Sequence, residues 1–404
     1  MRSLLCCLAA LFSFHAAFGA DPFIEKSDLF TAGDGGFKLY HIPGIAVTAT
    51  GTVLAWCEAR KKGGDWDQIE ILLRRSTDGG KTWTEAQSIA HVPGPKAKNP
   101  VSLRLKGVDP TDVTYNNPVL IPGRHGWVHM LFCLEYQRCF YQRSTDDGAS
   151  WSEPVEITQT FEAFHSVYPW KVLATGPDHG IQLKTGRLVA PIWLSIGTGG
   201  GAHRPSVAST IYSDDSGDTW HAGEVAVPGT EESINPSETV AIELADGRVM
   251  LNTRSESKAH RRLVTISQDG ATNWSTPKFD DALVEPVCMA GIVRYSLASD
   301  GGKNRILFCN PDNLTRADGK EEPGKNRDRK NMTVKLSYDE GQSWPVSKSI
   351  DSGPSAYSDI AVAKDGTILC FYGRGNKPGF AGEFLTLARF NLEWLTDGKD
   401  SPAK

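Results

Sequence analysis

Side chains that could carry out chemistry lie between regularly repeated segments of this sequence. Asp65 lies in GGDWDQIE, Glu238 in NPSETVAIE and Tyr357 in GPSAYSDIAV. Carboxyl groups can transfer protons, and a tyrosine hydroxyl can attack an electrophilic carbon when a base removes its proton. Each residue taken singly also has a structural interpretation, as a turn aspartate, a strand-end glutamate or a packed aromatic ring.

Two arginines accompany these residues. Arg254 follows Glu238 by 16 residues, and Arg329 precedes Tyr357 by 28 residues. A guanidinium group stays charged at any working pH and can bind a carboxylate through two hydrogen bonds. The sequence also allows Arg254 simply to pair with a nearby glutamate, and Arg329 to belong to the charged surface loop over residues 316–330.

Five copies of the pattern Ser-x-Asp-x-Gly-x-x-Trp form the framework around these residues. The copies, here called Asp boxes, are residues 76–83, 144–151, 213–220, 267–274 and 337–344. The fourth has Ala271 where the others have glycine, with Gly270 one place early. The starts of the boxes lie 68, 69, 54 and 70 residues apart. Self-similarity at such a period indicates a repeat architecture.

Each Asp box has the composition of a turn. The aspartate can hydrogen-bond nearby backbone, the glycine tolerates positive φ, and the tryptophan can pack under the turn. Since a β-rich run precedes each box, we expect each box to join two strands. Metal binding is the alternative, but each box offers only one or two carboxylates, and a calcium site usually needs more oxygens. We therefore expect turns and no bound metal.

Between the boxes the chain consists of short β-rich runs separated by Gly, Asp, Asn and Pro. Examples are residues 42–48, 52–57, 68–74, 127–134, 188–194, 262–266, 333–336 and 367–372. Many short strands at regular spacing predict a sandwich, barrel or propeller. A repeat of about 60 to 70 residues suits a four-stranded propeller blade. Residues 21–404 hold roughly six such repeats. We therefore predict an all-β fold that consists of one six-bladed β-propeller domain over residues 21–404.

Residues 1–20 have the features of a secretory signal peptide. Arg2 precedes an apolar run over residues 4–14, and small residues follow where cleavage would occur. The run is too short to cross a bilayer, so we expect a secreted or periplasmic protein without stable membrane insertion. A net charge of −5 gives no reason to expect a nucleic-acid partner.

Six cysteines lie beyond this leader, at positions 57, 133, 139, 288, 309 and 370. None forms a Cys-x-x-Cys pair, so we expect neither a zinc site nor a cofactor. Most lie in apolar runs, where cysteine acts as a small core residue. Cys133 and Cys139 could form a disulfide in an oxidising compartment, and the sequence leaves this open.

The motifs together resemble the bacterial-type sialidases, a family of exo-α-sialidases with a six-bladed propeller, repeated Asp boxes and an N-terminal Arg-Ile-Pro motif. Here His41-Ile42-Pro43 stands in the corresponding place, and the likeness extends to the closing segment RFNLEWL. Other propellers share Asp boxes, so the reactive residues between them are the more specific signal. The resemblance implies a retaining exo-sialidase that releases terminal sialic acids from sialylated glycans or glycoproteins.

The same resemblance implies a role for each reactive residue. Asp65 corresponds to the family's acid/base aspartate. Asp67 is a rival, but Asp65 has the better spacing, 24 residues after His41. Tyr357 corresponds to the nucleophile, and Glu238 to the base that removes its proton. A neutral tyrosine avoids the repulsion that a carboxylate nucleophile would meet at a sugar whose anomeric carbon bears a carboxylate.

The substrate carboxylate would be bound by arginines. Arg254 and Arg329 correspond to the second and third members of the family's arginine triad, but His41 stands in the first position. Histidine is shorter and is charged only part of the time near neutral pH. His41 could be protonated against the carboxylate, making activity acid-favoured, or Arg60 could supply the missing charge. The pocket could also accept a different or differently posed acidic sugar, such as a related ulosonic acid.

Two further groups of side chains suit sugar hydroxyls, an N-acyl group and ring stacking. The first surrounds the GTGGG segment and comprises Gln182, Trp193, His203 and Arg204; the second precedes the second Asp box and comprises Glu135, Tyr136 and Tyr141. A propeller that binds glycans without turning them over is a further alternative, although binding alone needs no nucleophile.

Overall fold

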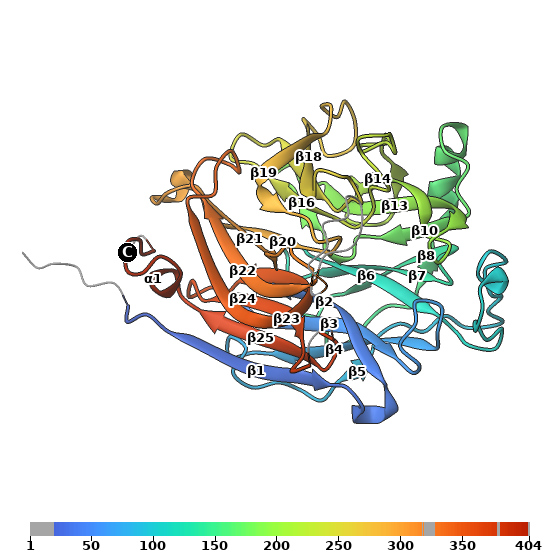
Figure 1. Ribbon diagram of the computed structural model, residues 1–404, viewed down its shortest axis with the longest axis horizontal. Coiled ribbons are helices and arrows are strands. Elements are labelled where there is room, and N and C mark those ends of the chain that lie inside the picture. The colour runs from blue at the N-terminus through green and yellow to red at the C-terminus, as the bar shows by residue number, and fades with distance from the viewer. Residues whose placement is uncertain (1–19, 317, 319–327, 378–379, 403–404) are drawn as a thin grey trace, which may run out of the picture.

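The computed structural model describes residues 20–316, 318, 328–377 and 380–402. The predicted leader lies outside this part except for its last residue. The described chain is almost entirely β-structure, and its sheets are arranged around a common centre (Figure 1). The runs expected to be strands from the sequence all coincide with strands. The prediction of an all-β, propeller-like fold is therefore confirmed.

Four sheets follow one another along the chain. The first contains β2 (Leu39–Val47), β3 (Val53–Arg60), β4 (Ile69–Ser76) and β5 (Gln87–Ser88). The second contains β6 (Tyr115–Pro122), β7 (Val128–Leu134), β8 (Arg138–Ser144), β9 (Val155–Glu156) and β11 (Asp178–His179). The third contains β10 (Val172–Thr175), β12 (Ile181–Gln182), β13 (Leu188–Gly199), β14 (Arg204–Ser213) and β15 (His221–Ala222). The fourth contains β16 (Thr239–Glu243), β17 (Val249–Thr253), β18 (Arg261–Ser267) and β19 (Lys278–Val284).

The fifth sheet has seven strands and joins both ends of the described chain. It contains β20 (Gly291–Ser296), β21 (Arg305–Pro311), β22 (Lys330–Ser337), β23 (Val346–Val362), β24 (Ile368–Arg374), β25 (Phe384–Phe390) and β1 (Ile24–Thr31). Its 17-residue strand β23 pairs with β22 over residues 346–354 and with β24 over residues 355–362. The described residues thus form five hydrogen-bonded sheets rather than six separate ones, because β23 runs continuously through two strand pairings.

Helical structure among the described residues is confined to short segments. They are α1 (Leu392–Leu395) and four 3-10 segments, Asp34–Gly36, Ser102–Arg104, Thr158–Ser166 and Ala298–Asp300. In the part of the chain that the structure describes, no helix is long and apolar enough to cross a membrane. The same part contains no group of three or more His, Cys, Asp or Glu side chains arranged to hold a metal ion.

The Asp boxes are turns, as predicted, and each joins two neighbouring strands of a sheet. In the first box, Ser76 Oγ donates to Asp78 Oδ1 at 2.7 Å and accepts from the Gly80 amide at 2.8 Å. Asp78 also accepts from the amide and hydroxyl of Thr82, at 2.9 and 2.7 Å. The aspartate is therefore used to close the turn.

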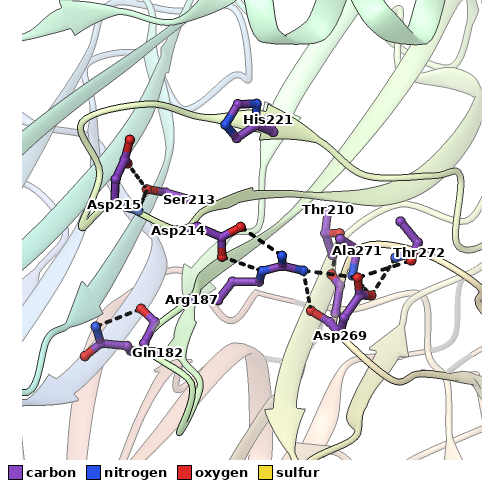
Figure 2. Close-up of polar contacts among 12 residues, drawn as sticks. Gln182, Arg187, Thr210, Ser213, Asp214, Asp215, His221, Asp269, Ala271 and Thr272 are labelled. Atoms are coloured by element: carbon purple, nitrogen blue, oxygen red, sulfur yellow. Dashed lines mark hydrogen bonds and ion pairs between the residues drawn. The ribbon is translucent and has the colours of Figure 1, made fainter.

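Arginines link boxes that belong to neighbouring sheets. Figure 2 shows Arg187 between Asp214 of the third box and Asp269 of the fourth, with nitrogen–oxygen distances of 2.7 and 3.1 Å. Arg75 similarly donates to the Asp147 carbonyl of the second box at 2.8 Å. The boxes thus hold consecutive sheets together as well as closing turns.

The six described cysteines are all buried free thiols. Cys133 and Cys139 face each other across the β7–β8 pair but are not joined. The open possibility of a disulfide between them is not realised in this structure. Burial raises the pKa of the Cys139 thiol well above its ordinary value, which keeps it protonated and unreactive.

Candidate active site

A polar cavity of about 230 Å³ brings together nine of the residues expected to act on or contact a substrate, with Trp193 and Tyr136 beside them. The nine are His41, Arg60, Asp65, His203, Arg204, Glu238, Arg254, Arg329 and Tyr357. These residues come from four of the five sheets or their connections, although they are up to 316 positions apart in the sequence. The propeller-like ring explains this, because the ends of its inner strands meet near the centre (Figure 1).

His41 reaches the cavity because strand β2 is irregular at this point. The pairing of β2 with β3 shifts register between His41 and Gly44, as at a β-bulge. Ile42 has φ of 55°, a left-handed conformation that a β-branched residue rarely adopts. The irregularity places the His41 ring 4.4 Å from the ring of Tyr357, centroid to centroid. Backbone strain of this kind is often found at functional sites.

Tyr357 occupies the centre of the constellation. It lies where the pairing of β23 with β24 is irregular, between Ser355 and Ser358. The hydroxyl of Tyr357 donates a hydrogen bond to Glu238 Oε1 and accepts one from Arg254 Nη1 at 2.6 Å. Burial raises the pKa of Tyr357 well above its ordinary value, so the phenol is neutral in the free protein.

The 16-residue spacing of Glu238 and Arg254 is explained by the hairpin between them. Glu238 directly precedes β16 and Arg254 directly follows β17, and these antiparallel strands pair Thr239 with Thr253. The two side chains consequently form an ion pair at the open end of the hairpin. Nε of Arg254 is buried and has no hydrogen-bond partner among the described residues. It remains available to donate to a bound anion.

Arg329 provides the positive charge that is least compensated. It precedes β22, and its guanidinium lies 5.3 Å from the centre of the Tyr357 ring. It donates to the Val287 carbonyl. Arg60, Arg204 and Arg254, the other three arginines of the cavity, each form an ion pair with a carboxylate. Arg329 forms none within the described ranges. A negatively charged ligand would therefore be attracted towards Arg329.

Asp65 lies at the mouth of the cavity, in the connection between β3 and β4. Its side chain is 49% exposed and accepts from Arg60 Nη1 at 2.7 Å. The other end of Arg60 donates to the buried Glu58 carboxylate at 2.6 and 2.9 Å. Desolvation would raise the pKa of Asp65, but the charges of Arg60 and His203 outweigh it and bring that pKa below its ordinary value.

The structure separates Asp65 from its rival Asp67. The Asp67 carboxylate is buried and accepts from the Gly64 amide at 2.8 Å, which closes the turn that carries Asp65. Asp67 does not line the cavity. Of the two aspartates, only Asp65 is placed to meet a ligand.

The surroundings of His41 bear on the three interpretations of its role. Burial, followed by the charges of Arg60 and Arg329, holds the pKa of His41 well below its ordinary value. His41 is therefore neutral in the free protein near neutral pH. Arg60, the alternative source of charge, is already paired at both ends, with Glu58 and Asp65.

Gln182 is one of three predicted contact residues that do not line the cavity; the other two, Glu135 and Tyr141, are described below. It lies on β12, which pairs with the start of β13, whereas the cavity lies at the other end of β13. Its amide accepts from the Arg124 backbone at 2.9 Å and donates to the Gly186 carbonyl at 3.0 Å. Figure 2 shows Gln182 beside the Asp boxes. The prediction that Gln182 contacts the substrate is therefore wrong. The 12-residue strand β13 separates Gln182 from the cavity, and the sequence did not show how long this strand is.

Comparison with known proteins shows the family and the fold of the chain. Residues 51–370 match the model of the BNR repeat-like domain family. The chain belongs to this family. A sialidase of Micromonospora viridifaciens is 31% identical over 405 residues, covering 93% of this chain and 55% of that protein. A sialidase of Bacteroides fragilis is 29% identical, covering 84% of this chain and 61% of that protein. The chain thus spans a little over half the length of these relatives.

Solved structures show a similar fold. The Hadza microbial sialidase Hz136 has a TM-score of 0.71 and 25% identity, covering 92% of this chain and 69% of that chain. A Trypanosoma rangeli sialidase has a TM-score of 0.68 at 20% identity, which supports the fold alone.

Some cavity residues of this BNR repeat-like domain escaped sequence reasoning. They are Asn117, Ser206, Asn235, Ser237 and Glu256. Asn117 and Asn235 have φ of 51° and 47°, and each directly precedes a proline. Asparagine tolerates this left-handed conformation better than most residues, but a residue before proline usually takes an extended one, so the sequence carried no signal for these two positions. In the predicted group that precedes the second Asp box, Tyr136 lines the cavity. Glu135 instead pairs with Lys98, and Tyr141 contacts His129.

Proposed function

We propose that this protein is a retaining exo-α-sialidase that hydrolyses terminal sialic acids from sialylated glycans. The observation that carries the proposal is the Tyr357 hydroxyl, which is hydrogen-bonded to both Glu238 and Arg254 inside an arginine-rich cavity. Sialidases are the known glycosidases that use a tyrosine nucleophile. The sialidase names of the relatives support the same activity.

The substrate carboxylate would be bound by Arg329 and Arg254. Arg329 supplies a charge that no described carboxylate neutralises, and Arg254 supplies a buried Nε without a partner. Both guanidinium groups lie close to the Tyr357 ring, at 5.3 and 5.9 Å. A carboxylate bound by these two groups would hold the anomeric carbon that carries it beside the Tyr357 hydroxyl.

In the first step, the Tyr357 oxygen attacks the anomeric carbon while its proton passes to Glu238. The bond to the leaving oxygen breaks, and Asp65 donates its proton to that oxygen. Asp65 must be protonated for this step. The negative charge of a bound substrate favours that form, because a nearby anion raises the pKa of a carboxyl group.

In the second step, Asp65 takes a proton from water, and the water oxygen attacks the anomeric carbon. The Tyr357–carbon bond breaks, and Glu238 returns its proton to the phenolate. Two inversions give net retention of configuration. Arg254 remains hydrogen-bonded to the tyrosine oxygen and stabilises the negative charge on it when it leaves.

A second candidate function is hydrolysis of a related ulosonic acid. It is favoured by the neutral, partly buried His41 in place of a third arginine. A shorter, uncharged side chain leaves a different space and a weaker field for the carboxylate. Turnover of a panel of aryl glycosides of acidic sugars would distinguish the two candidates by their relative kcat/KM.

Release of free sialic acid from sialyl-lactose at several acid and neutral pH values tests the activity. We expect release in the wild-type protein and loss of it in Asp65→Ala. A correctly folded sample that binds the glycan and releases nothing at any pH would instead support a non-catalytic glycan-binding propeller.

Two finer expectations belong to the same proposal. We propose that the seven-stranded sheet represents two blades that share β23, giving six blades in all. An apolar cluster that packs Leu307 and Val334 with Cys370 and Ala388 supports this division.

We also propose export to the periplasm or exterior, which N-terminal sequencing of the mature protein would test.

A further inference from the structure

The chemistry described above does not use a buried ion pair beside the cavity, formed by Arg262 and Glu285. Arg262 on β18 is fully buried, and Glu285, in the connection between β19 and β20, is 1% exposed. Nη1 of Arg262 donates to Glu285 Oε2 at 2.5 Å, and neither residue lines the cavity. Removing two charges from water costs about as much as their attraction returns, so stability alone does not explain such a pair.

The guanidinium of Arg262 is bound to the strand that leads to Arg254. Its Nε donates to Asn252 Oδ1 at 2.6 Å, and its Nη2 donates to the Asn252 carbonyl at 3.0 Å. Asn252 lies on β17, two residues before Arg254, and is itself fully buried. Arg262 thereby fixes the main chain from which the Arg254 side chain extends.

The same guanidinium holds the segment over residues 285–288. Nη1 of Arg262 donates to the Cys288 carbonyl at 3.0 Å. Oε1 of Glu285 accepts from the Cys288 amide at 2.7 Å, which closes the segment into a turn. Val287, inside this turn, is 1% exposed and has φ of 61°. Because a β-branched residue rarely adopts this left-handed conformation, the turn depends on the bonds that Glu285 and Arg262 make to it.

This turn holds Arg329 through its backbone. The Val287 carbonyl accepts a hydrogen bond from Arg329 Nη2, the only hydrogen bond that the Arg329 guanidinium makes to the described residues. Because a neutral carbonyl rather than a carboxylate holds Arg329, its charge remains available to a ligand. A carboxylate that bonds to both Arg254 and Arg329 requires a fixed spacing between the two guanidinium groups.

We propose that Arg262 and Glu285 are positioning residues that set the spacing between Arg254 and Arg329, and thereby the affinity of the cavity for a carboxylate. We name the pair of Arg262 and Glu285 the arginine clamp. Arg262 is joined to the strand that leads to Arg254 and, with Glu285, to the turn that holds Arg329. The inference rests on the proposed function and names two residues outside the cavity that determine how strongly its anionic substrate binds.

Binding of two ligands to the wild-type protein provides the reference for testing the clamp. The first ligand is 2,3-didehydro-2-deoxy-N-acetylneuraminic acid, which carries the carboxylate but has no glycosidic bond to hydrolyse. The second is its methyl ester, which lacks the negative charge. We expect calorimetry to show at least about tenfold tighter binding of the acid, because the ester loses charge-assisted hydrogen bonds to the arginines.

The double variant Arg262→Met/Glu285→Leu removes both charges of the clamp. Replacing a buried ion pair by apolar residues of similar volume is often neutral for stability, so the fold should be retained. We expect the preference for the acid to fall to about threefold or less, with little change in the affinity for the ester. Arg262→Lys keeps a charge for Glu285 but lacks the planar fork that reaches both segments. It should lower the preference by about twofold to threefold, and it serves if the double variant does not fold.

Arg305→Met/Asp400→Leu is the matched control. Arg305 and Asp400 form another buried ion pair, at 2.8 Å and with side chains 3% and 6% exposed, and neither residue lines the cavity. This variant removes a pair of the same kind that has no connection to Arg254 or Arg329. It should keep the full preference for the acid.

An unchanged preference in the folded double variant would overturn the proposal. Equal losses of affinity for the acid and the ester would also overturn it, because they would assign the pair a general role in the fold. Failure of the wild-type protein to bind the acid would contradict the inference together with the proposed function. A preference that the clamp variants weaken, in a wild-type protein that releases no sialic acid from sialyl-lactose, would support the clamp and contradict only the proposed hydrolysis.

Discussion

At the scale of single residues, the site is a set of charge pairs with one exception. Glu238 pairs with Arg254, Asp65 with Arg60, and Glu256 with Arg204, whereas Arg329 faces the cavity without a carboxylate partner in the described structure. A bound carboxylate would complete the set. Arg329 can therefore attract the anion, while the other charges of the site are already paired. Tyr357 stays neutral until Glu238 takes its proton.

The pairing of Asp65 with Arg60 predicts a pH effect. Asp65 acts in its acid form, so kcat should fall as pH rises through its pKa in the complex. Arg60 lowers that pKa. In the double variant Glu58→Gln/Arg60→Gln, the fall should therefore move to higher pH, by about one unit. Glu58→Gln alone retains Arg60 and should not move it upwards. A fall that moves to lower pH in the double variant would contradict the acid role of Asp65.

His41→Arg tests how the carboxylate is bound. A third guanidinium should lower KM for an aryl sialoside by about tenfold, because it adds charge-assisted hydrogen bonds. His41→Gln is the neutral control and should not lower it. Steady-state kinetics on both variants provide the measurement. Improved sialoside turnover in His41→Arg would favour selection of a related sugar acid, and unchanged KM would show that the remaining arginines suffice.

Much of this residue set could be predicted from the sequence because the Asp boxes provide fixed reference points. Glu238 and Arg254 illustrate this, since their spacing is the length of one hairpin. Gln182 could not be placed, because strand β13 is 12 residues long and its two ends lie far apart. Glu256 could not be assigned to the cavity from the sequence, because its pairing with Arg204 depends on contact between two sheets.

At the scale of elements, irregular stretches of strand present the functional side chains. Bulges or register shifts occur in β2 beside His41, in β6 beside Asn117 and in β23 beside Tyr357. Regular strands would alternate their side chains strictly between the two faces. The Asp boxes, in the outer strand connections, present no functional side chains. They fix the turns that hold each sheet together.

Asp78→Ala should therefore lower stability without changing the chemistry. It removes the hydrogen bonds to Ser76 and Thr82 that close the first box. We expect a loss of about 1 to 3 kcal/mol in the free energy of unfolding, measured by urea denaturation, with kcat unchanged. Lys81→Ala, in the same exposed turn, is the control and should leave stability nearly unaltered. A selective loss of kcat in Asp78→Ala would contradict a structural role for the box.

At the scale of the whole molecule, the first strand completes the last sheet. β1 pairs with β25, and Asp28 forms an ion pair with Arg374 at 2.8 Å across this junction. The ring of sheets is thus closed by segments from opposite ends of the described chain. The cavity lies at the meeting point of the sheets, so its geometry depends on this closure.

Removal of residues 1–31 should consequently destabilise the entire ring. We expect the melting temperature to fall by roughly 10 °C or more, since buried Phe30 and the β1–β25 pairing are lost. Removal of residues 1–22 keeps β1 and serves as the control. Calorimetry on both proteins provides the measurement, and similar melting temperatures would show that β1 does not contribute to closure.

The central claim is that Tyr357 forms a covalent bond to the anomeric carbon of a sialic acid. It can be tested by incubating the protein with 2,3-difluorosialic acid and locating any adduct by peptide mass spectrometry. The account predicts one adduct on the peptide that contains Tyr357, absent in Tyr357→Phe, whose kcat should also fall by about 10² to 10⁴. An adduct on another residue, or sialic acid release without any adduct, would contradict it.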